Sequence, residues 1–148
     1  MEELLSAWNY PDLGSVAFDT DKCDLVIGGK DRANTGKGYR AITHAAFVIA
    51  LMKYCRMKSI PHPGFVVLDT PVNPYKGPSQ SSSDKLSDDV KAAFFRYLAQ
   101  DGSGDQVIVM ENYDPPPDVI ASATYYNFTR NPHVGRYGFF PRRTEQER

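Results

Sequence analysis

The stretch Phe65-Val66-Val67-Leu68-Asp69-Thr70-Pro71 runs from four consecutive apolar residues into an aspartate and a turn. A short, continuous apolar run predicts a strand buried on both faces, as in the parallel sheets of α/β proteins. A carboxylate at the carboxyl end of such a strand lies where open α/β sheets bind their ligands. Asp69 is therefore a candidate site residue, and a capping role in the Asp-Thr-Pro turn is the alternative.

A second segment ends in the same way. Residues 106–110, Gln-Val-Ile-Val-Met, lead into Glu111 and Asn112, and residues 84–100 between the two segments carry apolar residues at helical spacing. A strand, a helix and another buried strand predict a parallel βαβ unit. If the strands are neighbours, Asp69 and Glu111 lie at the same edge of the sheet.

The residues before this unit predict a hairpin followed by a long helix. Segments 15–18 and 24–27 are short strand candidates joined by a turn, and residues 28–38 form a loop rich in glycine and charge. Residues 39–58 predict a helix that is apolar over most of its circumference and therefore largely buried. On such a helix, we expect His44 to be a core or boundary residue rather than a ligand.

The segments outside these elements are less regular. The loop 70–83 is rich in Pro, Gly and Ser, which is typical of functional or disordered connections. Residues 118–130 predict a helical turn and a short strand over 123–128. The aromatic tail around residues 135–141 predicts either packing or a contact surface for a partner, and residues 142–148 are expected to fray.

Composition and charge describe one ordinary domain. The 148 residues carry a formal net charge of −1, so no overall field attracts nucleic acid or an anionic membrane. Cys23 and Cys55 form no CxxC pair and indicate reduced thiols. The N-terminus lacks the features of a signal peptide, and the longest apolar run, 45–52, is too short to cross a bilayer. We therefore expect residues 1–148 to form a single cytoplasmic domain.

The loop before the long helix has features of an anion-binding site. Asn34-Thr35-Gly36-Lys37-Gly38 stands where the helix begins, and backbone N–H groups at a helix N-terminus attract phosphate. Arg32, Lys37 and Arg40 would add charge-assisted contacts. A solvated, flexible loop is the alternative.

This loop does not form a Walker A motif. The pattern GxxxxGK[ST] requires a glycine where this chain has Asp31 and a hydroxyl residue where it has Gly38. The chain therefore offers a candidate phosphate contact without a complete phosphate cradle of its own.

The order of these elements resembles the C-terminal half of an ABC-type ATPase head, most of all the SMC-like ATPases of DNA repair and anti-phage systems. The resemblance covers residues 8–114. It implies an α/β fold that is the C-terminal lobe of a P-loop NTPase, with a central, mostly parallel sheet flanked by helices and an N-terminal β-hairpin. In that family the N-terminal half carries the Walker A loop, and a long coiled coil intervenes.

The resemblance also implies roles for individual residues. Residues 34–38 take the place of the signature motif, which contacts the γ-phosphate of ATP held by the opposing head. Asp69 matches the Walker B aspartate that supports Mg²⁺. Pro71-Val72-Asn73 falls where the D-loop begins, and Asn112 aligns with the switch histidine.

Two departures from the family pattern affect hydrolysis. Thr70 stands where the catalytic glutamate normally follows the Walker B aspartate, and a threonine cannot act as a carboxylate base. Asn112 can hydrogen-bond a phosphate or a water but cannot take its proton at neutral pH. Glu111, at the end of the neighbouring strand, is the candidate replacement base.

The resemblance thus implies an ATP- and Mg²⁺-dependent half-domain completed by a Walker A-bearing segment or partner chain. Such a composite site implies an oligomer, with DNA as a possible target and no membrane partner. One alternative is a non-catalytic ABC-like interaction module. Another is a hydrolase in which Asp69 and Glu111 hold a pair of divalent metal ions.

Overall fold

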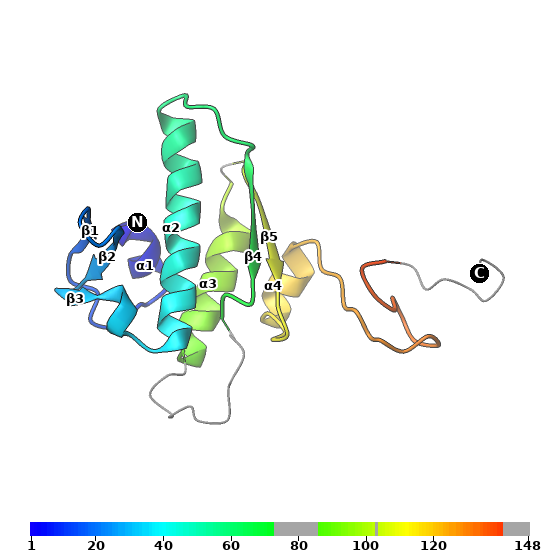
Figure 1. The fold of residues 1–148 in the computed structure, drawn as a ribbon. Helices are drawn as coiled ribbons and strands as arrows, with labels where there is room; N and C mark the ends of the chain where they lie inside the picture. Colours follow the sequence, from blue (N-terminus) through cyan, green and yellow to red (C-terminus); the bar gives the residue numbers. More distant parts are fainter. Residues whose placement is uncertain (73–85, 103, 141–148) are drawn as a thin grey trace, which may run out of the picture.

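The computed structural model describes residues 1–72, 86–102 and 104–140 (Figure 1). Most of the predicted loop 70–83, including Asn73, the first residues of the predicted helix 84–100, and the tail 142–148 lie outside the described residues. In chain order, the elements are α1 (Glu2–Ala7), β1 (Val16–Asp19), β2 (Asp24–Ile27), β3 (Lys30–Asp31), the 3-10 helix η1 (Arg32–Asn34), α2 (Lys37–Met57), β4 (Phe65–Asp69), α3 (Asp88–Gln100), β5 (Gln106–Met110) and α4 (Pro117–Ser122).

The N-terminal part is a small antiparallel sheet with strand order β1-β2-β3. β1 and β2 form the predicted hairpin, with Val16 opposite Ile27 and Asp19 opposite Asp24. The two-residue strand β3 lies in the segment predicted as a loop. The sequence did not predict this strand, because Lys30 and Asp31 show no alternation of apolar and polar residues.

The second sheet contains the two parallel strands β4 and β5, which α3 connects. This arrangement confirms the predicted βαβ unit. The register runs from Phe65 opposite Gln106 to Asp69 opposite Met110. The molecule is therefore a mixed α/β protein with a small antiparallel sheet and a two-stranded parallel sheet.

The hydrophobic core lies between the parallel sheet, α2, α3 and α1. α2 and α3 lie on the same side of β4 and β5 (Figure 1). Leu68 of β4 is buried with Ile42 of α2 and Phe94 of α3. Trp8, which follows α1, meets the Phe94 ring edge-on at a centroid distance of 4.9 Å. The predicted burial of α2 is confirmed for eight of its residues, from Gly38 to Cys55.

The prediction that β4 and β5 are buried on both faces is wrong. Their side chains alternate between a face packed on the helices and a face open to solvent. The open face consists of Phe65, Val67, Ile108 and Met110, which are 46%, 52%, 40% and 46% exposed. The physical reason is that, among the described residues, helices cover only one side of this two-stranded sheet.

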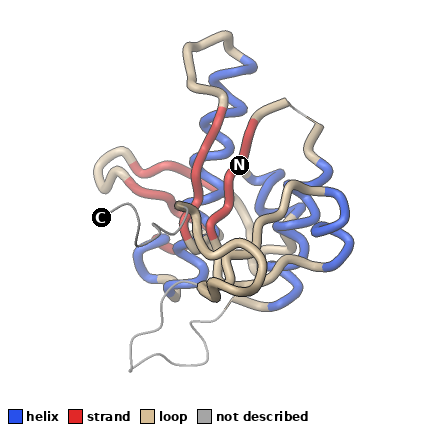
Figure 2. Tube along the Cα trace, turned by 90° about the vertical axis from the view of Figure 1, so that its right-hand side faces the viewer, coloured by secondary structure: helices blue, strands red, loops and turns tan. Residues whose placement is uncertain are grey.

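The predicted strand over residues 123–128 is also wrong. α4 ends at Ser122, and the tail, defined here as residues 123–140, extends away from the body of the molecule in Figure 1, so that it runs towards the viewer in Figure 2, which is turned by 90°. Among the described residues of the tail, β pairing is limited to an isolated bridge between Phe128 and Arg136. Aromatic residues favour strands only where a neighbouring strand or a packed layer receives them.

Candidate functional site

The two acids predicted at the strand ends do lie at the same end of the parallel sheet. Asp69 pairs with Met110, and Glu111 follows one residue later. α2 begins at this end of the molecule as well (Figure 1), so residues 34–38 lie at the same end as the two acids. The fold thus brings the three predicted parts of the site to one end.

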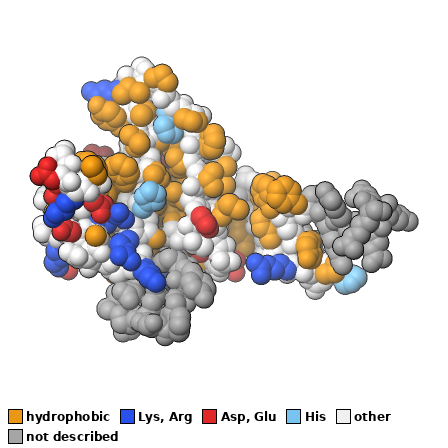
Figure 3. All heavy atoms as spheres, in the orientation of Figure 1, with side chains coloured by type: hydrophobic (Ala, Val, Ile, Leu, Met, Phe, Trp, Pro, Cys, Tyr) orange, Lys and Arg blue, Asp and Glu red, His pale blue; other side chains and the backbone are white. Residues whose placement is uncertain are grey.

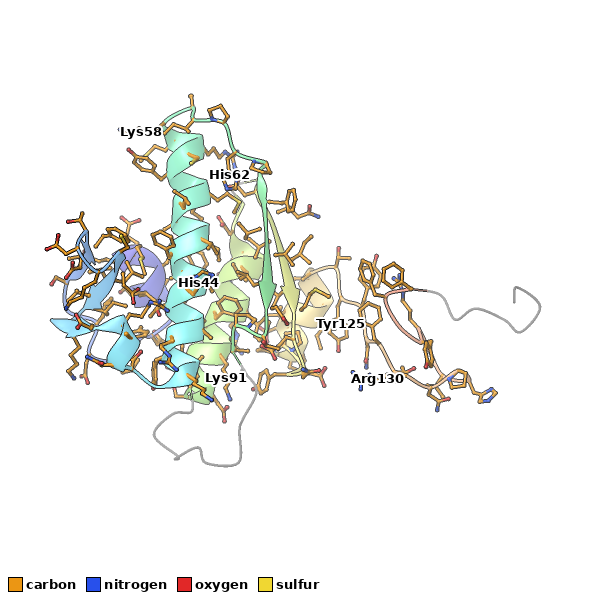
Figure 4. All side chains as sticks on the ribbon, in the orientation of Figure 1. His44, Lys58, His62, Lys91, Tyr125 and Arg130 are labelled. Atoms are coloured by element: carbon orange, nitrogen blue, oxygen red, sulfur yellow. The ribbon has the colours of Figure 1, made fainter. Side chains whose placement is uncertain are left out.

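Asp69 is exposed and opens onto a groove of about 540 Å³ between α2 and the outer edge of β4. The groove is lined by Ala41, His44, Ala45, Val48, Val66, Val67, Leu68, Asp69 and Pro71. His44 was expected in the core or at its boundary, but it is exposed on the side of α2 that faces β4 (Figure 4). The helical pattern did not reveal this exposed position, which makes His44 a lining residue of the groove.

Glu111 links the ends of the two strands. Its Oε2 accepts a hydrogen bond from the Val72 N–H at 3.0 Å, and its Oε1 accepts one from the Asn112 N–H at 2.8 Å. Val72 is 1% exposed, so this carboxylate holds the start of the segment after β4 against the core. Asn112 itself is exposed.

The carboxylates of Asp69 and Glu111 belong to opposite sides of the sheet. Asp69 is in phase with Val67 on the open face, whereas Glu111 is in phase with Val109, which packs towards the helices. Within the described ranges, no three His, Cys, Asp or Glu side chains gather into a group that would hold a metal ion. The geometry therefore favours Asp69 alone, rather than the pair, as a ligand at this end.

Thr70 has an unusual backbone conformation. Its φ is +49°, and its N–H donates to the Met110 carbonyl at 2.8 Å. A β-branched residue in the left-handed region is a steric outlier that costs about 1–3 kcal/mol. The strained peptide directly after Asp69 fixes where β4 stops and where Asp69 stands. The sequence indicated only a turn here, since Asp-Thr-Pro does not specify the sign of φ.

The loop before α2 presents backbone donors. Gly36 is the N-cap residue of α2, and its carbonyl accepts from the Arg40 N–H at 2.9 Å. The N–H groups of the first turn, beginning with Lys37 and Gly38, have no acceptor within the helix. The Lys37 and Asn34 side chains are exposed, and Figure 3 shows basic side chains gathered where α2 begins.

The predicted basic residues have different partners. Arg32 Nε donates to Asp24 Oδ1 at 2.6 Å, which engages Arg32 with the N-terminal sheet. Arg40 Nη1 donates to the Ala33 carbonyl at 3.2 Å, and Thr35 Oγ1 donates to the Arg32 carbonyl at 2.8 Å. These contacts fix the loop, and they leave Lys37 as the predicted cation best placed for a ligand.

Comparisons with protein-family models, with curated proteins and with solved structures find no match for this chain. Across the part of the chain that the structure describes, no helix combines the length and the apolar character that crossing a membrane requires.

Proposed function

We propose that this chain supplies one half of a composite ATP site in an SMC-like ABC-type ATPase. The chain would provide the signature loop 34–38 and the Walker B residue Asp69, and a Walker A-bearing segment or partner chain would complete the site. The observation that supports this proposal is the convergence of the α2 N-terminus, Asp69 and Glu111 at one end of the molecule. The ATPase would act in the cytoplasm, with DNA as a candidate target.

The proposal assigns a role to each residue of the site. Asp69, exposed at the end of β4, would hold Mg²⁺, which neutralises charge on the phosphates. The N–H groups of Lys37 and Gly38 would face the γ-phosphate of the opposing head. Asn112 would hydrogen-bond a phosphate or the attacking water.

Glu111 has two contributions in this proposal. Its hydrogen bonds to the Val72 and Asn112 N–H groups position the residues that follow both strands. The same carboxylate is the candidate general base, because Thr70 cannot take a proton. Replacement of Glu111 by Gln removes the base and keeps one of the two acceptor oxygens, so one of the two backbone hydrogen bonds is lost with it.

Nucleotide binding measured with and without a partner tests the proposal. We expect the isolated chain to bind ATP weakly or not at all, and a mixture with a Walker A-bearing polypeptide to bind and hydrolyse it. The polypeptide encoded directly upstream is the first candidate. Asp69→Asn should abolish turnover in the mixture, whereas Asp21→Asn, on the exposed turn between β1 and β2, should leave it intact.

The Glu111→Gln variant tests the base, and its urea unfolding measures the effect of the lost backbone hydrogen bond. Loss of a general base lowers turnover by about 100-fold or more. Unchanged turnover of the Glu111→Gln mixture removes Glu111 from that role and leaves its structural contacts as its function.

A second candidate function is a non-catalytic interaction module. The open face of β4 and β5 and the exposed aromatic side chains of the tail favour it, because contiguous apolar surface of this kind marks interaction sites. A stable complex that binds no nucleotide would support the module and contradict the ATPase.

A further inference from the structure

The tail, residues 123–140, is held in a defined shape by its own contacts. The Thr129 N–H donates to the Arg136 carbonyl at 2.9 Å. The Arg136 guanidinium lies over the rings of Tyr126 and Phe128, at 5.1 Å and 5.4 Å from their centroids. A segment that is ordered before it binds loses less conformational entropy on binding than a flexible one. These contacts therefore prepare the tail for binding to a second surface.

The start of the tail is attached to the body by a hydrogen bond. The Tyr125 hydroxyl donates to Asp114 Oδ1 at 2.8 Å, and Asp114 lies shortly after β5. Beyond this point the apolar side chains of the tail face solvent, and Tyr126, Phe139 and Phe140 are 61%, 62% and 78% exposed. Within the described ranges, no tail residue belongs to the core. Exposed apolar surface of this extent marks an interaction site.

The open face of β4 and β5 lies on the same side of the molecule as the tail. In Figure 1, α2 and α3 lie on one side of the two strands, and the tail leaves on the other. The open face consists of Phe65, Val67, Ile108 and Met110, which are all exposed. Two copies can therefore face each other so that each tail reaches the sheet of the other copy. Such a reciprocal contact closes as a dimer, whereas a head-to-tail contact that does not close would form open chains.

Charge and area favour this pairing. The tail carries Arg130, His133 and Arg136 and no acidic residue. Among the strand residues in phase with the open face, Asp69 is the one charged residue. A basic tail on this face therefore opposes no like charge, which would disfavour the contact. The exposed aromatic side chains of two tails, with the two faces, offer on the order of 1,000 Å² of apolar surface, which is enough for a specific interface.

We propose that the tail of one copy packs on the open face of β4 and β5 of a second copy, and that the second copy returns the contact. The chain then forms a symmetric dimer. This dimer requires neither nucleotide nor a Walker A-bearing partner, so it is independent of the proposed ATP site. Since the tail adds no residue to the described core of its own copy, each copy folds alone, and dilution separates the two copies without unfolding them.

Sedimentation equilibrium of the full chain over a range of concentrations, without nucleotide, tests the dimer. We expect a reversible equilibrium between monomer and dimer. The double variant Phe139→Ser/Phe140→Ser removes apolar surface from the tail, and Met110→Lys places a cation on the face that receives the basic tail. Each change occurs twice in the dimer, so both variants should raise the dissociation constant at least about tenfold. Met57→Ser, at an exposed position of α2 outside both surfaces, should leave it unchanged.

Several results would overturn the proposal, provided that urea unfolding in dilute solution shows each variant to be folded. A parent chain that is monomeric at about 100 μM lacks the interface. A dimer that is unaffected by the tail variant pairs through the sheets alone. A dimer that is unaffected by Met110→Lys pairs through the tails alone.

A nitroxide on the tail distinguishes contact between two copies from contact within one copy. Cys23→Ser removes the exposed native thiol, and Val134→Cys places the spin label on the tail. In a mixture with an isotope-labelled parent chain, the amide signals of Val67 and Met110 in the parent should broaden, and that of Phe18 in β1 should not. Broadening that requires the spin label and the isotope on the same chain means that the tail covers its own sheet, and it overturns the proposal.

Discussion

At the scale of single residues, Thr70 is the clearest point of strain. Its φ of +49° is unfavourable for a β-branched side chain and normal for glycine. We expect Thr70→Gly to raise the free energy of unfolding by about 1 kcal/mol, since the relief of strain exceeds the extra chain entropy of glycine. Urea unfolding measures this change.

Thr20→Gly is the matched control for this prediction. Thr20 lies in the turn between β1 and β2 and is not among the residues with positive φ. Glycine there should lower stability by up to about 1 kcal/mol. A loss of stability at both positions would show that Thr70 is not strained.

The contact between Asp24 and Arg32 makes stability depend on pH. The hydrogen bond from Arg32, and then that from the Leu25 N–H, holds the pKa of Asp24 below its usual value of 3.8. A depressed folded-state pKa adds stability that is present above 3.8 and is lost as the pH falls through the folded-state pKa. The difference in urea midpoint between the parent chain and Asp24→Asn should therefore be larger at neutral pH than in acid. A difference that does not change with pH would refute the role of this ion pair.

The sequence located the acids at the strand ends but not their partners. Asp69 and Glu111 follow apolar runs, and a local pattern is sufficient to place a residue at the end of a strand. The bonds from Glu111 to the Val72 N–H and from Arg32 to Asp24 join residues of different elements. Such contacts depend on the tertiary arrangement, which no local pattern encodes.

At the scale of elements, the start of α3 depends on its N-cap. Ser87 Oγ accepts a hydrogen bond from the Val90 N–H at 3.3 Å, and Asp88 and Asp89 stand in the first turn. Ser87→Ala should lower the free energy of unfolding by about 1 kcal/mol. Ser87→Asp should keep most of the parent stability, because an aspartate also caps a helix N-terminus. Thermal unfolding of the three proteins tests this prediction. Equal losses in both variants would exclude the cap as the cause.

The same cap explains an error in the predicted boundary. The helix was expected from residue 84, because its apolar stripe includes Leu86, but the structure has Leu86 buried outside the helix and α3 beginning at Asp88. β5 occupies residues 106–110, as predicted, because an apolar run between polar residues defines both its ends. Patterns of burial locate an element, and capping residues determine where a helix starts.

At the scale of the whole molecule, burial on one side is the feature that the sequence did not predict. Four apolar residues in a row favour a strand buried on both faces, yet Phe65 and Val67 face solvent. The apolar run is thus typical of a strand packed on both faces, whereas the described residues pack on one face only. Among the described residues, no strand pairs with the outer edge of β4 either, so this two-stranded sheet has an open face and an open edge.

The tail supplies a test of where the stable part of the molecule ends. Among the described residues, Val119 of α4, at 5% exposed, is the last core residue, and the tail residues 123–140 contribute none. A chain that ends at Ala123 should therefore keep its free energy of unfolding within about 0.5 kcal/mol of the parent value. A chain that ends at Pro116 loses Val119 and the ion pair between Arg96 and Asp118, and should lose roughly 1.5–3 kcal/mol. A loss of similar size in both truncations would mean that the tail packs on the core in solution. If only the shorter chain is destabilised, the tail is dispensable for folding and its exposed aromatic side chains are available to a partner.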